Sequence, residues 1–122
     1  MPRLLTTAGA VLAAAMLVAA PAKAGYLTGA ELTSLCRANV GGHGHVVEAA
    51  ECLGYIVGVA DTFDCVEPLH GFHWDSKRNI SQPQLVSTVV NWIEAHPSAE
   101  AYESDGLVGA ALAEAYPCTP QQ

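Results

Sequence analysis

Four cysteines are the strongest constraint on how this 122-residue chain can fold. Cys36, Cys52, Cys65 and Cys118 all lie beyond residue 24, and their spacing forms neither a Cys-x-x-Cys motif nor a zinc-ligand pattern. An even number of cysteines in a small domain outside the cytoplasm is typical of a disulfide framework. We therefore expect two disulfides, with no cysteine left for catalysis.

The first 24 residues have the features of a signal peptide. Arg3 precedes an apolar, alanine-rich run over residues 8–20, and Ala22-Lys23-Ala24 is the small-x-small pattern that signal peptidase cleaves after. The alternative is a retained membrane anchor, but a span needs about 20 apolar residues and this run is shorter. We predict that residues 1–24 are cleaved and that residues 25–122 form a single exported domain.

The predicted mature domain is strongly acidic. It keeps three basic residues against 12 acidic ones, which gives a formal net charge of −9. Without a basic cluster it is poorly suited to nucleic acid, so we expect no nucleic-acid partner and a basic surface on any protein that binds by charge.

Helical patterns account for nearly all of the mature domain. Capping signals and apolar spacing predict helices over residues 28–38, 46–63, 81–96 and 104–116. The first helix begins with Thr28 and Glu31 in a capping box, and the third begins with Ser81 and Gln84 in another. The fold class is therefore all-α, a small bundle of about four helices stapled by two disulfides.

The second predicted helix contains a row of small residues. Ala50, Gly54 and Gly58 recur every four positions within "AECLGYIVGVAD" and would leave one smooth face. A glycine inside a helix costs roughly 1 kcal/mol relative to alanine, so we expect another part of the chain to pack tightly against this face.

The helix order also favours one disulfide pairing among the three that four cysteines allow. Cys36 near the end of the first helix and Cys52 in the second could meet across a short hairpin. Cys65, in the following loop, would then pair with Cys118 after the last helix.

Residues 64–79 form a long segment without periodicity, and such loops often carry function. Its candidate partner-binding residues are His70, Phe72, His73 and Trp74, because large side chains on a tethered loop are typical protein anchors. The alternative is that Trp74 folds back as a lid over the core.

Motifs for catalysis or metal binding are weak. His43 and His45, together with the two loop histidines, could bind zinc or copper, but they have no cysteine or carboxylate partner at a fixed spacing, so we predict no metal and no cofactor. Asp61 and Asp64 could serve acid–base chemistry, but Asp61 more simply ends the second helix facing solvent. We therefore predict that the protein is not an enzyme.

Four segments, in order, resemble one protein family. They are "YLTGAELTSLC" (26–36), "CLGYIVGVAD" (52–61), "QLVSTVVNWIEAHP" (84–97) and "LVGAALAEAYPC" (107–118). The chain is similar to the Rap/Tai immunity proteins, which protect bacteria from type VI secretion peptidoglycan amidases. The resemblance implies a periplasmic, non-catalytic protein that binds an amidase effector and inhibits it, often as a homodimer.

Two other functions stay open from the sequence. One is a periplasmic metal- or ligand-binding helical module that uses the loop histidines, and the other is a structural envelope protein without a toxin partner.

Overall fold

The computed structural model describes residues 26–38 and 44–120, and these form an all-α bundle. The helices are α1 (Gly29–Arg37), α2 (Val46–Ala60), α3 (Gln82–Ala95) and α4 (Ser104–Ala115), with a short 3-10 helix, η2 (Pro97–Ala99), between α3 and α4. The four-helix prediction is therefore confirmed. The described residues include no helix that is both long enough and apolar enough to cross a membrane.

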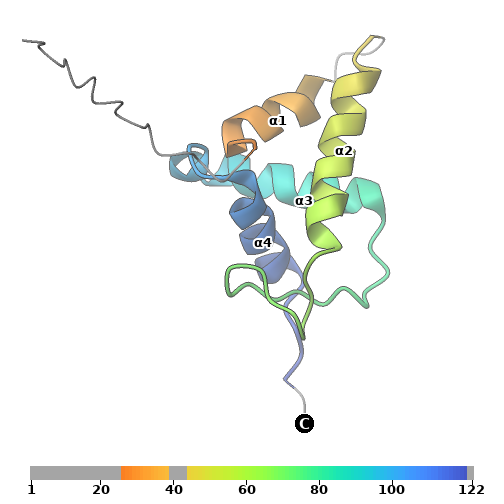
Figure 1. Cartoon of the computed structure of the whole chain (residues 1–122), viewed down its shortest axis with the longest axis vertical. Coiled ribbons are helices and arrows are strands. Elements are labelled where there is room, and N and C mark those ends of the chain that lie inside the picture. Colours follow the sequence, from red (N-terminus) through yellow and green to blue (C-terminus); the bar gives the residue numbers. More distant parts are fainter. Residues whose placement is uncertain (1–25, 39–43, 121–122) are drawn as a thin grey trace, which may run out of the picture.

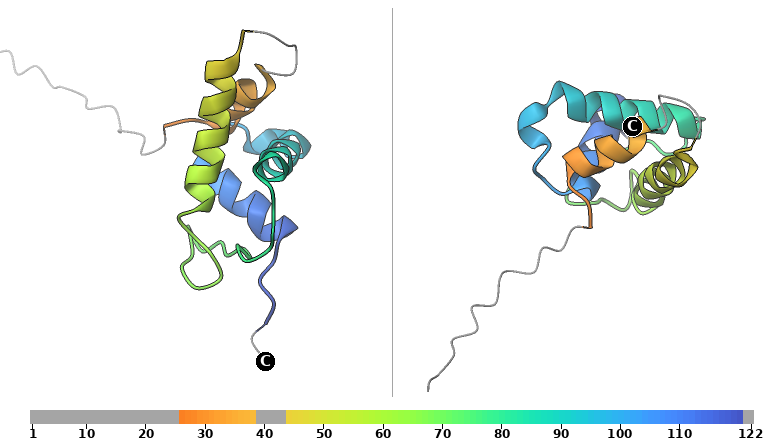
Figure 2. Two further views of the ribbon diagram at one scale, coloured as in Figure 1. Left: turned by 90° about the vertical axis from the view of Figure 1, so that its right-hand side faces the viewer. Right: turned by 90° about the horizontal axis from the view of Figure 1, so that it is seen from above.

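Each of the four helices contacts the other three. In Figure 1, α2 stands upright while α3 crosses behind it at a steep angle. The loop after α2 and the segment after α4 lie at the same end of the molecule, as the two views in Figure 2 show. The fully buried side chains come from all four helices and include Leu32, Ile56, Ile93 and Leu112.

Both predicted capping boxes are present. The Thr28 hydroxyl accepts the Glu31 amide while the Glu31 carboxylate accepts the Thr28 amide, and Ser81 and Gln84 repeat this arrangement at α3. These side chains satisfy amide groups that the first turn of a helix leaves without a partner.

Both disulfides follow the favoured pairing. Cys36–Cys52 joins α1 to α2 across 16 residues, and Cys65–Cys118 joins the loop after α2 to the segment after α4 across 53 residues.

The second helix is shorter than predicted. It ends at Ala60 rather than at residue 63, and Asp61 is the exposed C-cap, as expected for that residue. The Thr62 hydroxyl donates to the Val59 carbonyl at 2.7 Å, which closes the turn, and Phe63 still reaches the core. The helical spacing of apolar residues therefore continues to Phe63, although the backbone leaves the helix after Ala60.

The expected tight packing over the small-residue face of α2 is wrong. Ala50, Gly54 and Gly58 are exposed. A Cβ atom added to Gly54 or Gly58 would meet no atom within 4 Å, so no other described segment requires these glycines. Close packing occurs instead at Gly29 in α1, where an added Cβ would lie 2.5 Å from a Leu107 methyl group.

Candidate binding surface

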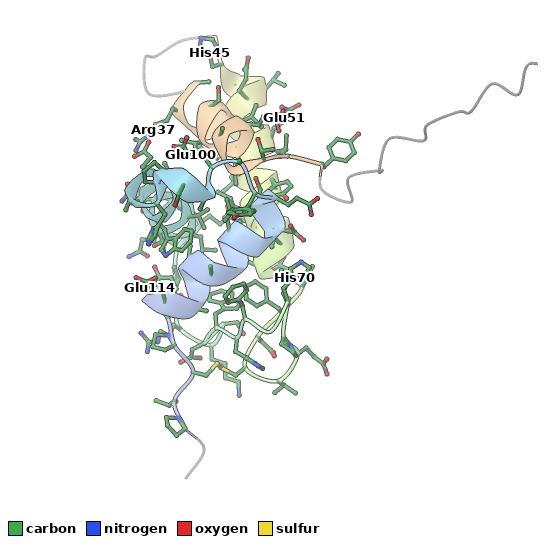
Figure 3. The ribbon with its side chains drawn as sticks, turned by 90° about the vertical axis from the view of Figure 1, so that its left-hand side faces the viewer. Arg37, His45, Glu51, His70, Glu100 and Glu114 are labelled. Carbon is green, nitrogen blue, oxygen red and sulfur yellow. A yellow bond between two sulfur atoms is a disulfide. The ribbon has the colours of Figure 1, made fainter. Side chains whose placement is uncertain are left out.

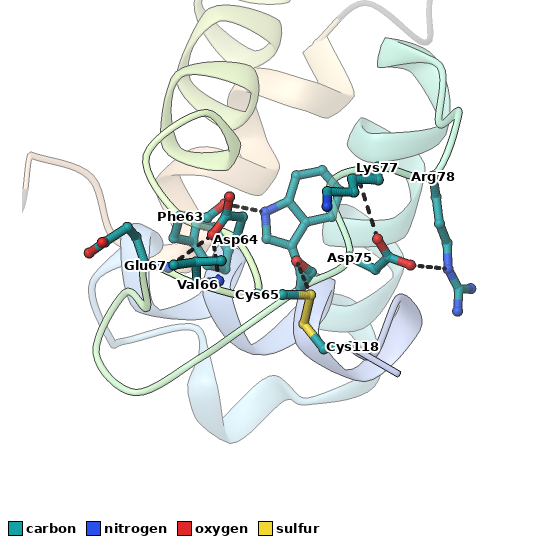
Figure 4. The surroundings of a disulfide bond; sticks show 10 residues. Phe63, Asp64, Cys65, Val66, Glu67, Asp75, Lys77, Arg78 and Cys118 are labelled. Carbon is teal, nitrogen blue, oxygen red and sulfur yellow. Dashed lines mark hydrogen bonds and ion pairs between the residues drawn. A yellow bond between two sulfur atoms is a disulfide. The ribbon is translucent and has the colours of Figure 1, made fainter. Parts of the chain in front are cut away.

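The loop over residues 64–79 is held at its start by local bonds and a disulfide (Figure 4). Asp64 Oδ1 accepts the amides of Val66 at 2.6 Å and Glu67 at 2.9 Å, and these two bonds lower the pKa of the Asp64 carboxyl. Next to this turn, Cys65 is bonded to Cys118. The loop therefore leaves α2 in one fixed direction.

Trp74 holds the other side of the loop from within the core. Its side chain is 5% exposed and its indole N–H donates to the Phe63 carbonyl at 2.6 Å. The ring lies between Phe63 and Tyr116, with ring centroids 6.1 and 6.3 Å away. Of the two roles considered for Trp74, the structure shows the lid over the core.

A tight turn forms the tip of the loop. Leu69 and Phe72 exchange two backbone hydrogen bonds, and the two residues between them, His70 and Gly71, have positive φ values of 51° and 84°. Paired left-handed residues are the geometry of a type I′ hairpin turn. Figure 3 shows His70 at the top of this loop, beside α2 and α4.

Two contacts fix the tip on α4. His70 Nε2 lies 2.8 Å from Asp105 Oδ2, so the ring N–H donates to the carboxylate. The Phe72 ring packs on Gly109, where an added Cβ would lie 2.9 Å from the ring. The loop is thus pre-organised rather than a free tether.

The four candidate partner-binding residues consequently divide into two pairs. Phe72 is half-buried and Trp74 is buried, so both mainly hold the loop in place. His70 and His73 are exposed. The loop also exposes Val66, whose side chain is 72% accessible.

A surface hollow of about 670 Å³, not anticipated from the sequence, adjoins the tip of the loop. Backbone hydrogen bonds build it: Gly29 N–H donates to the Tyr102 carbonyl and Ser104 N–H donates to the Leu27 carbonyl, both at 2.9 Å. These bonds join the segment before α1 to the segment before α4. Its lining includes Tyr26, Glu31, His70, Tyr102, Glu103 and Asp105.

Negative charge shapes the electrostatics of this hollow. The hydrogen bond from His70 is the largest cause that lowers the pKa of Asp105. Burial raises the pKa of the nearby Tyr55 hydroxyl, and the charges of Asp105 and Glu103 raise it further. The acidic and aromatic residues come from both ends of the chain, so only their clustering in "AYESD" (101–105) could have indicated the hollow in the sequence.

A second groove, which adjoins the hollow at Asp105, lies along α2. Asp105 lines both, and the groove is also bordered by Gly54, Gly58 and Leu69. Two residues of the small-residue face of α2, Gly54 and Gly58, therefore lie in a depression between α2, α4 and the loop.

Within residues 26–38 and 44–120, no three His, Cys, Asp or Glu side chains come together as a metal site. His45 instead lies 3.5 Å from Glu48, while His43 falls outside the described residues. The structure thus defines a class of protein: a small, disulfide-linked, all-α domain with a fixed exposed loop.

Comparison with known families specifies this class further. The family model for Rap1a immunity proteins matches residues 28–118, about three quarters of the chain, and the chain therefore belongs to this family. The resemblance to Rap/Tai proteins is confirmed. No curated protein shows significant similarity to the chain.

Membership of the family gives the chain an immunity function against a secreted effector protein. The two disulfides indicate a domain that resides outside the reducing cytoplasm.

Proposed function

We propose that this protein is a periplasmic immunity protein that binds a type VI secretion peptidoglycan amidase and inhibits it. The match to Rap1a immunity proteins over residues 28–118 is the observation that carries the proposal. An immunity protein acts by binding its effector rather than by catalysis. A signal peptide over residues 1–24, removed to leave residues 25–122, would bring it to the compartment in which the amidase acts.

The loop over residues 64–79 is the proposed inhibitory contact. It is exposed at Val66, His70 and His73, and it is fixed by Trp74 and by the second disulfide. A segment that is already ordered loses little conformational entropy on binding, which favours affinity. Such a loop can enter and block the cleft of an enzyme.

A pull-down and a growth assay test the function. Tagged protein, exported with its disulfides formed, is used to capture proteins from the periplasm. In the growth assay, cells with and without this protein receive an effector encoded next to its gene, and their survival is scored. Capture of an amidase together with protection would support the proposal. Failure to capture an amidase, together with no protection, would refute it.

One matched pair of variants tests the contact loop. Val66 in the loop and Val46 at the start of α2 are 72% and 75% exposed, so Val66→Asp and Val46→Asp introduce the same change at equal exposure. We expect Val66→Asp to weaken inhibition by about tenfold or more, as for an interface hot spot, and Val46→Asp to leave it unchanged. The opposite ranking would exclude the loop as the contact.

A homodimer remains a prediction from the resemblance. Sedimentation of the purified domain measures it directly.

A further inference from the structure

The hollow beside α4 has two aromatic rings that the fold leaves in solvent. Tyr26 is 94% exposed and Tyr102 is 67% exposed, and both line the hollow. Aromatic rings held at a concave surface commonly anchor a partner at protein interfaces. Because backbone bonds join the two segments that carry these rings, the hollow does not depend on a partner to form.

Carboxylates dominate the charge around the rings, and the one imidazole among the lining residues, His70, is already bonded to Asp105. Glu31, Glu103 and Asp105 line the hollow, and among the described residues no lysine or arginine does. A carboxylate offers about four acceptor positions, so Asp105 can accept further donors beside His70. Carboxylates next to aromatic faces suit an arginine or lysine side chain, which can pair with the former and stack on the latter.

The groove on α2 offers a place for the backbone of the partner segment that would carry this arginine or lysine. Gly54 and Gly58 line the groove, and a Cβ added at either glycine would meet no atom of the described chain within 4 Å. Each glycine makes the helix less stable than an alanine at the same position would. A partner backbone that approaches closely gives these two positions a function.

We propose that the hollow and the α2 groove form one docking surface for a basic segment of a partner protein. An arginine or lysine side chain occupies the hollow, between the tyrosine rings and the carboxylates, and the adjoining backbone lies over Gly54 and Gly58. This surface lies next to the inhibitory loop and shares His70 with it, so one partner can contact both.

Charge selects a basic partner over a second copy of this chain. The predicted mature domain has a net charge of −9, so two copies repel each other, most strongly where carboxylates line the contact. The inference rests on the proposed function only for the identity of the protein that carries the basic segment.

A peptide titration tests the surface without the effector. The disulfide-intact domain is titrated with Ac-Gly-Arg-Gly-Arg-Gly-amide and with the matched peptide in which glutamine replaces arginine, followed by amide NMR shifts. We expect only the arginine peptide to shift Gly54, Gly58 and Gly106, and its binding to weaken as salt rises. Equal shifts with both peptides would overturn the proposal.

Two substitutions make the test specific. Glu103 lines the hollow, so we expect Glu103→Gln to weaken arginine-peptide binding by about tenfold. The control Glu51→Gln, exposed on α2 and outside both the hollow and the groove, should not weaken it. Gly58→Ala should raise Tm by about 4 °C yet weaken the peptide several-fold.

The remaining outcomes separate this inference from a contact between copies and from the proposed function. If Gly58→Ala leaves peptide affinity unchanged and instead abolishes a dimer in sedimentation, the face is a contact between copies. If the peptide binds but no amidase is captured and no protection is seen, the proposed function fails while this inference stands. If an amidase is captured with unchanged affinity by Glu103→Gln, the inference fails alone.

Discussion

Replacing Trp74 by phenylalanine should destabilise the domain although the new side chain remains aromatic and apolar. The indole N–H is the donor to the Phe63 carbonyl at 2.6 Å, and both residues are buried. Phenylalanine has no such donor, so the carbonyl would lose this partner in a place that water reaches poorly.

The structure sets the size of this effect. Leaving a buried acceptor unsatisfied costs about 1–3 kcal/mol. The smaller ring also leaves space between Phe63 and Tyr116, and partial removal of a buried side chain adds about 1 kcal/mol. The total loss is about 2–4 kcal/mol, a large part of the roughly 5–15 kcal/mol that stabilises a small domain.

Trp92 provides the matched control. It is half-buried, its indole N–H donates to the exposed Glu114 carboxylate at 2.8 Å, and its ring stacks on His96. In Trp92→Phe, water can replace the lost bond, so the cost should stay below about 1.5 kcal/mol. Urea unfolding of the oxidised protein, followed by far-ultraviolet circular dichroism, compares both variants with the wild type.

The ranking of the two variants decides the outcome. If Trp74→Phe unfolds at the same urea concentration as Trp92→Phe or a higher one, Trp74 does not anchor the loop as described. An unchanged slope of free energy against urea is required for the comparison, because a changed slope indicates a different unfolded state.

Three further predictions follow from other contacts. Replacing Cys65 and Cys118 by serine should lower the free energy of unfolding by about 4 kcal/mol, and replacing Cys36 and Cys52 should lower it by about 3 kcal/mol. The first loss is larger because the Cys65–Cys118 bond closes the longer loop of the unfolded chain. Urea unfolding midpoints test this order, and a reversed order would contradict it. Gly109→Ala should destabilise by about 1–3 kcal/mol, because the added Cβ would press on the Phe72 ring. Gly54→Ala should instead stabilise, because its added Cβ meets no atom. Thermal unfolding compares the two variants, and equal Tm changes would disprove the packing described. The pKa of Asp105 is lowered in the folded state, chiefly by the hydrogen bond from His70. This bond therefore stabilises the domain at pH values above the ordinary pKa of aspartate. Its contribution is lost as the pH falls through the lowered pKa of the folded state. The Tm difference between wild type and Asp105→Asn should therefore shrink from pH 7 to pH 3, and a constant difference would refute the linkage.

Local chemistry made much of the fold predictable. The capping boxes at Thr28 and Ser81 depend on residues three positions apart, and such contacts are readable from sequence. The disulfide pairing followed because the helix order brings Cys36 near Cys52 and leaves two cysteines for each other.

Features that depend on tertiary neighbours were not predictable in this way. The spacing of Gly54 and Gly58 indicates a smooth helix face, but only the packing shows that this face points to solvent. The two roles of Trp74 likewise have the same local sequence, and they differ only in whether the indole reaches the Phe63 carbonyl. The hollow joins residues near position 26 to residues near position 105, a pairing with no local signal.

The long disulfide also couples the shape of the loop over residues 64–79 to the order of biosynthesis. Cys118 follows α3, η2 and α4, so its bond to Cys65 can close only after all of these segments have been made and have met an oxidising environment. A copy of the chain still in the cytoplasm lacks this constraint on the loop. The loop over residues 64–79 thus gains this constraint only once both cysteines are in an oxidising environment.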